Sequence, residues 1–221
     1  YQGIDLVSFT GSTDVGRKIS LAAAPDFKRC ILELGGKSPN ILFENCQVET
    51  AVQQGLAHCF RNAGQSCNAA SLMLVQDGIY DQVLVLAKQD ADQTRMGPPS
   101  ENGDHLGPVI SKAQYDRVQV LIQSGIDQGA RLIAGGLGRA DGFKQGFYVR
   151  PTVFADVTPD MRIAKEEIFG PVLCVVRAES AEQAMQLIND HEYGNGTCIF
   201  TRDGEAARYF ADNIQVGMVG I

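Results

Sequence analysis

Cys67 is the residue of this chain best suited to act as a nucleophile. It lies in the segment Asn62-Ala-Gly-Gln-Ser-Cys67-Asn-Ala-Ala-Ser71, where small and polar residues separate a predicted helix from a predicted strand. A cysteine that is exposed and solvated by backbone groups favours the thiolate, which is the nucleophilic form of the side chain. The segment by itself also fits a free loop cysteine without chemistry, so that alternative stays open at this point.

Glu33 is the candidate for the base that such a nucleophile needs. An enzyme that builds a thioester on a cysteine must activate water to break it, and a carboxylate can do so. Glu33 stands at the end of an apolar segment, just before Gly35 and Gly36. We expect desolvation there to raise the pKa of its carboxyl group, which suits a general base. The alternative is an ion pair with Arg29 or Lys37, and Lys37 itself is predicted to be a surface cation.

Two glycine-rich turns could hold phosphate. The turn at residues 11–16 follows a predicted strand and opens a predicted helix, so free N–H groups and the positive end of the helix dipole would meet an anion there. Because Thr13 breaks the G-x-G-x-x-G pattern, an ordinary turn capped by Ser12 or Thr13 is the alternative. Gly-Gly-Lys-Ser at 35–38 is not a P-loop, because Ile31 occupies the position of the motif's first glycine.

Four short motifs occur together in this chain. They are Phe9-Thr-Gly-Ser12, Leu32-Glu-Leu-Gly-Gly-Lys-Ser-Pro39, Gly64-Gln-Ser-Cys67 and Lys165-Glu-Glu-Ile-Phe-Gly-Pro171. In this order and approximate spacing they make the chain resemble the aldehyde dehydrogenase superfamily over residues 5–221. The resemblance implies an α/β fold: the family's catalytic domain, a largely parallel sheet with helices on both faces, plus a remnant of the cofactor-binding domain.

The same resemblance divides the chain at residue 34. Residues 1–34 match the C-terminal remnant of a dinucleotide-binding domain, and residues 35–221 match the catalytic domain. The chain opens on Tyr1 and starts just before the first motif, so we expect it to be a piece of a longer protein. On its own we expect it to bind the dinucleotide weakly and to complete no turnover.

The resemblance also implies the roles of individual residues. Cys67 matches the nucleophile that attacks the aldehyde carbon, forming a thiohemiacetal and, after hydride transfer to the nicotinamide, a thioester. Glu33 matches the glutamate that activates the hydrolytic water, and the backbone N–H of Cys67 helps to hold the oxyanion. The residues that match the binding site for NAD or NADP are Gly11, Ser12, Thr13, Val15, Gly16, Leu34, Glu167 and Phe169.

Within that set the resemblance distinguishes three positions along the cofactor. Gly11 and Ser12 match the turn under the pyrophosphate, and Val15 matches a residue beside the adenine. Glu167 and Phe169 match the pair that positions the nicotinamide ribose and ring.

The implied reaction is the oxidation of a small aldehyde or semialdehyde to a carboxylate. Residues 193–201 and 216–220 resemble the methylmalonate-semialdehyde dehydrogenase branch, which passes its acyl group to coenzyme A. That branch lacks a glutamate at the position of Glu33 and usually has arginine in place of Ser66, so hydrolysis is favoured here. Two alternatives from other classes are a cofactor-free cysteine hydrolase that uses Cys67 and Glu33, and a non-catalytic folded domain.

The elements that must position these residues alternate along the chain. Short apolar segments alternate with segments of helical periodicity, which is typical of βαβ units and a largely parallel sheet. Strands are predicted at residues 5–10, 30–34, 38–43, 71–75, 130–134, 152–155, 172–177 and 196–201, and helices at residues 17–24, 47–61, 80–93, 113–129, 181–190 and 204–213.

Composition excludes several classes of partner. The 221 residues carry a net charge of -7, which argues against nucleic acid because phosphate must be neutralised by clustered basic residues. No uninterrupted apolar stretch approaches the roughly 18 residues of a membrane span. From the resemblance we expect the full-length protein to be a homo-oligomer.

The six cysteines indicate neither a metal site nor a disulfide scaffold. No pair has the C-x-x-C spacing of a zinc or redox site, and the number is small for this length. Cys30, Cys174 and Cys198 lie in apolar segments and are predicted to fill the core. Free thiols indicate a reducing compartment, so we expect the protein to be cytoplasmic.

Overall fold

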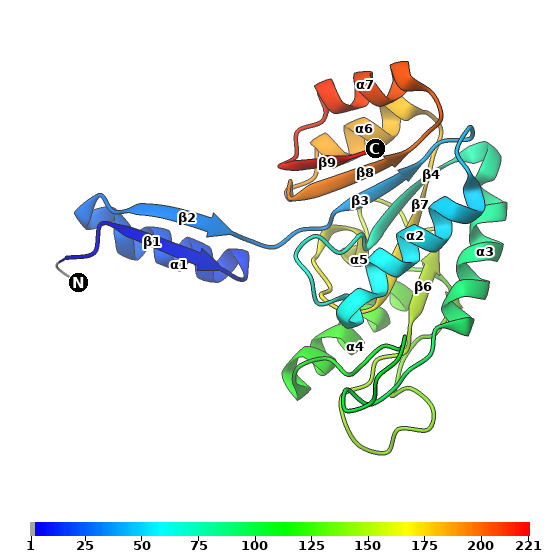
Figure 1. The fold of residues 1–221 in the computed structure, drawn as a ribbon, viewed down its shortest axis with the longest axis horizontal. Coiled ribbons are helices and arrows are strands. Elements are labelled where there is room, and N and C mark those ends of the chain that lie inside the picture. The colour runs from blue at the N-terminus through cyan, green and yellow to red at the C-terminus, as the bar shows by residue number, and fades with distance from the viewer. Residues whose placement is uncertain (1–2) are drawn as a thin grey trace.

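The computed structural model describes residues 3–221, and in these residues the strands form two β-sheets. The smaller sheet pairs β1 (Leu6–Thr10) with β2 (Arg29–Glu33) in parallel, and α1 (Thr13–Ala23) connects the two strands. Figure 1 shows this βαβ unit projecting from the rest of the chain. The fold is of the α/β class, as the sequence predicts.

The larger sheet has seven strands in the order β5-β6-β7-β4-β3-β8-β9. All neighbouring pairs are parallel except β5 and β6, which are antiparallel. Parallel neighbours bring the carboxyl ends of β3, β4 and β7 to one edge. The strands are β3 (Pro39–Leu42), β4 (Leu72–Gln76), β5 (Arg131–Ala134), β6 (Thr152–Ala155), β7 (Val172–Ala178), β8 (Gly196–Phe200) and β9 (Met218–Gly220).

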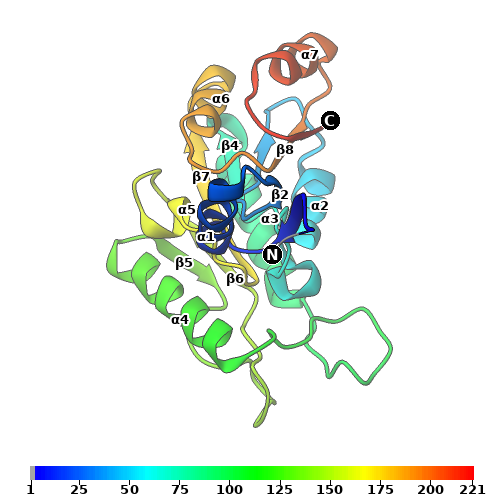
Figure 2. The ribbon, with the colours of Figure 1, turned by 90° about the vertical axis from the view of Figure 1, so that its left-hand side faces the viewer.

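Helices cover both faces of the larger sheet, so its central strands are buried on both sides (Figure 2). Along β4, Leu72 and Leu74 face one apolar cluster while Met73 and Val75 face the other. This alternation follows from the two-residue period of a strand and explains why the central strands are apolar throughout. One cluster contains residues of α2 (Val48–Phe60) and α3 (Tyr80–Gln93), and the other contains residues of α4 (Lys112–Asp127), α5 (Arg162–Lys165), α6 (Ala181–Asn189) and α7 (Gly204–Asn213).

The predicted elements are present, with small shifts at their ends that have physical causes. Helix α1 begins four residues earlier than predicted because Ser12 caps it, accepting a hydrogen bond from the backbone N–H of Val15. Helix α4 ends two residues earlier than predicted, and Gly129 follows it with φ +88°. The four-residue helix α5 was not predicted, because it is too short to show a period.

Two predictions about burial need correction. Lys37 is not a surface cation: only 1% of it is exposed. Its position after the β2 strand carries it under the loops at the edge of the larger sheet, where its ammonium group reaches a backbone carbonyl. Of the three cysteines predicted in the core, Cys174 is fully buried, whereas Cys30 and Cys198 are only half-buried because they lie on strands near a sheet edge.

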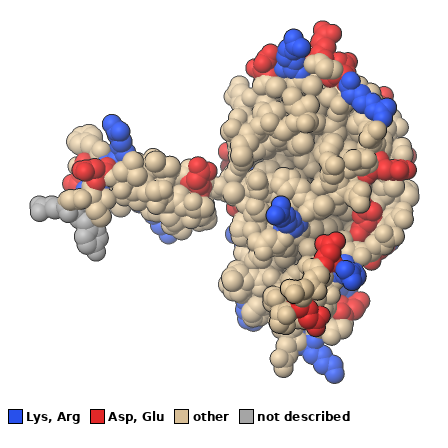
Figure 3. Space-filling view, in the orientation of Figure 1, with Lys and Arg blue, Asp and Glu red and all other residues tan. Residues whose placement is uncertain are grey.

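The projecting unit exposes several large apolar side chains. Phe27 is 94% exposed and Ile31 is 51% exposed. On the face of the whole molecule that Figure 3 shows, lysines and arginines are scattered among acidic residues. Within residues 3–221 no helix is both long and apolar enough to cross a bilayer.

Candidate active site

A cleft of about 610 Å³ is lined both by residues of the projecting unit and by residues of the loops beside the larger sheet. It collects residues from six parts of the sequence: the β1–α1 turn, the end of β2, the loop after α2, the start of α4, the loop after α5 and the loop after α6. Of the ten predicted site residues, eight line it: Gly11, Ser12, Thr13, Glu33, Leu34, Cys67, Glu167 and Phe169.

The remaining two predicted residues, Val15 and Gly16, do not line the cleft. Val15 is 40% exposed and lies in the first turn of α1. Gly16 is buried against Leu34, and a Cβ at Gly16 would come within 2.5 Å of the Leu34 Cδ2 atom. In this structure Gly16 therefore allows α1 to pack on the end of β2.

The loop that carries Cys67 has a constrained backbone. Asn62 and Ala63 both have positive φ, +54° and +53°, a conformation that non-glycine residues rarely adopt. Two reciprocal bonds hold the turn: Asn62 Nδ2 donates to the carbonyl of Gln65, and Gln65 Nε2 donates to the carbonyl of Asn62, each at 3.1 Å. Cys67 is half-buried and lines the cleft. Strain of this kind is characteristic of functional sites.

Gly64 fixes the distance between this loop and the loop after α5. Its φ is +73°, and a Cβ there would collide with the backbone carbonyl of Gly170. We expect Gly64→Ala to lower the free energy of unfolding by about 3 kcal/mol, combining left-handed strain with a backbone collision. The measurement is chemical denaturation monitored by circular dichroism.

Gly129→Ala is the matched control for this substitution. Gly129 also has positive φ, +88°, but a Cβ there would meet nothing within 4 Å. Only the backbone strain remains, so we expect a loss of about 1–2 kcal/mol. Equal losses for the two variants would show that the contact between the two loops is not tight.

Gly35 and Gly36 are required by close approach rather than by phosphate binding. A Cβ at Gly36 would lie 2.5 Å from the backbone oxygen of Cys67 and 2.8 Å from Cβ of Asn195. A Cβ at Gly35 would collide with the carboxylate of Glu167. The pair therefore lets the chain pass between the cysteine loop and Glu167.

Glu33 is the last residue of β2. It is exposed and lines the cleft. The burial that we expected at this strand end is absent, because Glu33 lies with Arg29 and Ile31 on the exposed face of β2. Neither Arg29 nor Lys37 forms an ion pair with Glu33 among residues 3–221, so the alternative structural role is not seen. The carboxylate faces the same cleft as Cys67.

Glu167 is the half-buried carboxylate of the cleft. Its Oε1 atom accepts a hydrogen bond from the backbone N–H of Gly36 at 3.2 Å. Burial raises the pKa of Glu167, and the hydrogen bond from Gly36 together with the nearby Arg117 partly opposes that rise. Two residues further on, Phe169 has φ +56° and lines the cleft.

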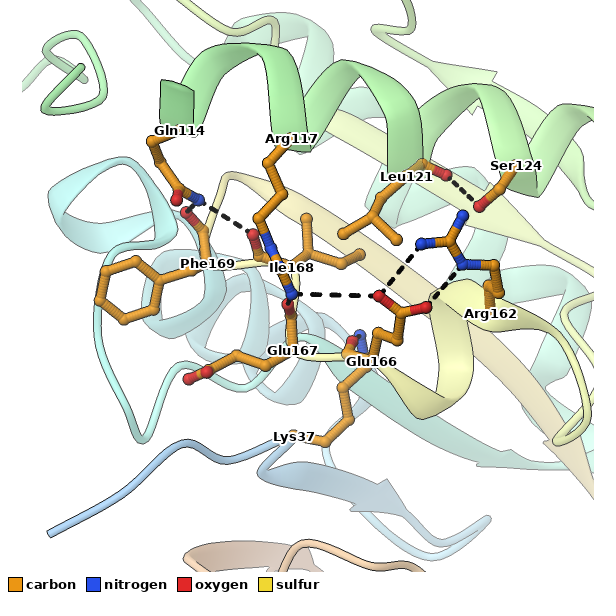
Figure 4. A network of polar contacts seen from close by, with 10 residues as sticks. All are labelled: Lys37, Gln114, Arg117, Leu121, Ser124, Arg162, Glu166, Glu167, Ile168 and Phe169. Carbon is orange, nitrogen blue, oxygen red and sulfur yellow. Dashed lines mark hydrogen bonds and ion pairs between the residues drawn. The ribbon is translucent and has the colours of Figure 1, made fainter. Parts of the chain in front are cut away.

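The cleft residues that sequence reasoning did not predict include Gln114, Arg117 and Tyr193. Gln114 and Arg117 stand one turn apart at the start of α4, and Figure 4 shows both pointing at residues 166–169. No local motif marks them, because only the tertiary fold brings α4 to this loop. Among residues 3–221 no group of three or more histidine, cysteine or acidic side chains could hold a metal ion.

Comparison with known proteins gives a single family. The model of the aldehyde dehydrogenase family matches residues 1–221. A 3-succinoylsemialdehyde-pyridine dehydrogenase from a Pseudomonas species is 45% identical over 216 residues, which cover 98% of this chain and 45% of that protein.

Solved structures agree in fold as well as in sequence. An aldehyde dehydrogenase from Bartonella henselae superposes with a TM-score of 0.96 and 50% identity, over 98% of this chain and 45% of that one. A variant of aldehyde dehydrogenase C from Pseudomonas syringae, in complex with NAD+ and octanal, gives a TM-score of 0.96 and 45% identity over the same shares. The chain thus spans a little under half the length of these relatives. With its whole length matched and its fold reproduced, the chain belongs to the aldehyde dehydrogenase family.

Proposed function

We propose that the protein carrying this chain oxidises an aldehyde to a carboxylate with NAD, using Cys67 as the nucleophile and Glu33 as the base. The observation that carries the proposal is that Cys67, Glu33 and the N-terminal end of α1 all line the same cleft. The relative from Pseudomonas syringae, which binds NAD+ and octanal, supports the choice of cofactor and substrate class.

The cleft fits a dinucleotide in three respects. Gly11 and Ser12 lead into α1, which begins at Thr13, and helix N–H groups and the helix dipole favour a pyrophosphate there. Gly35 leaves open the space that a Cβ would fill beside Glu167. The Glu167 carboxylate can accept hydrogen bonds from ribose hydroxyls. Bound NAD would supply the hydride acceptor for the oxidation.

In the first step the thiolate of Cys67 attacks the aldehyde carbon and forms a carbon–sulfur bond, giving a thiohemiacetal. The backbone N–H of Cys67 can donate to the oxyanion that develops. Bound NAD would supply the acceptor for the hydride of this carbon, and the oxyanion would then close to the carbonyl of a thioester on Cys67.

In the second step Glu33 removes a proton from water, which attacks the thioester carbonyl. The carbon–sulfur bond breaks, the thiolate of Cys67 is restored and the carboxylic acid leaves. The exposure of Glu33 toward the cleft gives water access to the carboxylate.

Transfer of the acyl group to coenzyme A is the second candidate. The resemblance of residues 193–201 and 216–220 to the methylmalonate-semialdehyde branch favours it, and the semialdehyde in the name of the Pseudomonas relative fits a semialdehyde substrate. The presence of Glu33 favours hydrolysis. Comparing the rates of NADH formation with and without coenzyme A distinguishes the two.

We further propose that residues 1–34 belong to a dinucleotide-binding domain and residues 35–221 to the catalytic domain. The apolar side chains that β1, α1 and β2 expose support this, because exposed apolar patches mark surfaces that pack against other parts of a protein. Six free cysteines support a cytoplasmic location, and the edge strand β9 supports a homo-oligomer assembled through its sheet.

The proposal is tested by following NADH absorbance with short aldehydes and semialdehydes, NAD or NADP, and the protein that carries this chain. Expected are NADH formation and its loss after alkylation of Cys67 by iodoacetamide. Ester hydrolysis that proceeds without any dinucleotide, with no aldehyde oxidation, would instead support the cysteine hydrolase alternative.

The raised pKa of Glu167 predicts how dinucleotide affinity depends on pH. If the ionised carboxylate binds the ribose, affinity is lost as the pH falls through this pKa, at higher pH than for an ordinary glutamate. Glu167→Gln is expected to weaken binding by about 10–100-fold at neutral pH, the scale of a lost charge-assisted hydrogen bond, and to remove this pH step. The measurement is a titration of NADH fluorescence from neutral to mildly acidic pH.

Glu182→Gln is the control for the pH step. Glu182 is exposed on α6 and lines a different cavity. Its substitution should leave both the affinity and its pH dependence unchanged. A pH step that survives in Glu167→Gln would assign the titration to another group.

A further inference from the structure

Residues 166–169 form an irregular segment whose backbone carbonyls are all bonded to side chains. The carbonyl of Glu166 accepts from Lys37 Nζ at 2.9 Å, and that of Glu167 accepts from Arg117 Nη2 at 3.1 Å. Gln114 Nε2 donates to the next two carbonyls, at 3.1 and 2.8 Å. Figure 4 shows these three side chains converging on the segment.

This arrangement replaces the hydrogen bonds that a strand or helix would supply. The segment lies between α5 and β7 and belongs to neither, so its carbonyls need other donors. Three side chains from two distant parts of the chain supply them. These three residues therefore help to hold the segment in its conformation.

Lys37 is the least expected of the three. It is 1% exposed and does not line the cleft, so it cannot touch a ligand there. Burial lowers the pKa of Lys37, an effect that the nearby Glu167 and Glu166 partly oppose. Burying an ammonium group costs free energy unless the group is hydrogen-bonded. The ammonium group of Lys37 donates to the Glu166 carbonyl.

Gln114 and Arg117 are themselves held at the start of α4. The Ser111 side chain caps the helix by accepting from the backbone N–H of Gln114 at 3.2 Å. The guanidinium of Arg117 also lies 3.9 Å from the Glu166 carboxylate. Two nitrogens of Arg162 donate hydrogen bonds to the same carboxylate. The backbone of the segment and the side chain at its start are thus both fixed.

The conformation that results is one that the segment would not adopt alone. Phe169 has φ +56°, a left-handed conformation that a bulky residue rarely adopts. Such a backbone persists only where its surroundings over-determine it. In this conformation Glu167 and Phe169 both line the cleft.

We propose that Lys37, with Gln114 and Arg117, is a positioning residue that holds residues 166–169 so that Glu167 and Phe169 face the dinucleotide. The proposal rests on the proposed function for its ligand. Because Lys37 stands outside the cleft, it acts through the segment, and its effect on binding must shrink when Glu167 no longer contributes.

The test is a double-mutant cycle of Lys37→Met with Glu167→Gln in the protein that carries this chain. Methionine has a similar length but donates no hydrogen bond. Lys37→Met is expected to weaken NADH binding about tenfold in the wild-type background and by less than about twofold in the Glu167→Gln background. The rate of alkylation of Cys67 should stay within about twofold.

Lys112→Met is the matched control, because Lys112 lies on the exposed side of α4 and pairs with Asp116. It should change neither NADH binding nor alkylation. Equal effects of Lys37→Met in the two backgrounds, or no effect in either, would overturn the proposal. If Lys37→Met does not fold, the shorter, uncharged Lys37→Gln takes its place in the cycle with the same expected outcomes, because Gln114 and Arg117 line the cleft themselves.

Hydrogen exchange separates failure of this proposal from failure of the proposed function. In the dinucleotide-free protein, amides of residues 167–170 should exchange faster in Lys37→Met than in Lys112→Met. Unchanged exchange overturns the positioning role whether or not the protein binds NADH. If the amides exchange faster in Lys37→Met but the wild-type protein binds no NADH, the positioning role is retained and the dinucleotide is rejected as the ligand.

Discussion

Replacing Cys67 by alanine is expected to abolish aldehyde-dependent NADH formation, lowering kcat by roughly 10⁴-fold or more, the scale seen when an enzyme loses its covalent nucleophile. Without the thiolate no thiohemiacetal forms, and the aldehyde carbon has no route to release its hydride. The measurement is steady-state NADH absorbance in the protein that carries this chain. NADH binding should be retained, because no dinucleotide contact is assigned to the thiol.

Cys198→Ala is the control for this substitution. Cys198 is half-buried like Cys67 but lies on β8 and lines another cavity. Its substitution should leave NADH formation within about twofold of the wild type. If Cys67→Ala kept appreciable activity while Cys198→Ala lost it, the assignment of the nucleophile would be wrong.

The sequence predicts the fold well because its local signals agree with its topology. The apolar strand at 172–177 and the helical period at 80–93 both reappear as β7 and α3. Parallel pairing follows from their alternation. The sequence does not reveal the antiparallel pairing of β5 with β6, because a short strand has the same pattern in either direction.

The candidate site is predicted less completely than the fold. Motifs mark Cys67, Glu33 and Glu167 because each stands within a recognisable string of residues. Lys37 stands within such a string too, yet its burial under the loops is not visible in a stretch of glycines, serine and proline. Gln114 stands in an ordinary amphipathic helix. Its hydrogen bonds to Ile168 and Phe169, which follow it by 54 and 55 positions, arise only from the tertiary fold. Residues that position a site through the fold therefore escape detection by local pattern.

Substituting Glu33 by glutamine should separate the two halves of the reaction. Steady-state turnover is expected to fall by roughly 10²–10⁴-fold, the contribution of a general base, because the thioester on Cys67 is no longer hydrolysed. The first turnover does not need this base. Rapid mixing with NAD and an aldehyde should therefore show a burst of about one NADH per Cys67, followed by a slow phase.

The control and the competing mechanism use the same experiment. Glu49→Gln, on the exposed first turn of α2, should leave the steady state unchanged.

Intact mass spectrometry of Glu33→Gln after the burst should find the acyl group on Cys67. Release of that group by coenzyme A faster than by water in the wild-type protein would favour acyl transfer over hydrolysis. Loss of the burst itself would place Glu33 before the thioester, in activation of the nucleophile, since only a step that precedes hydride transfer can remove the first turnover.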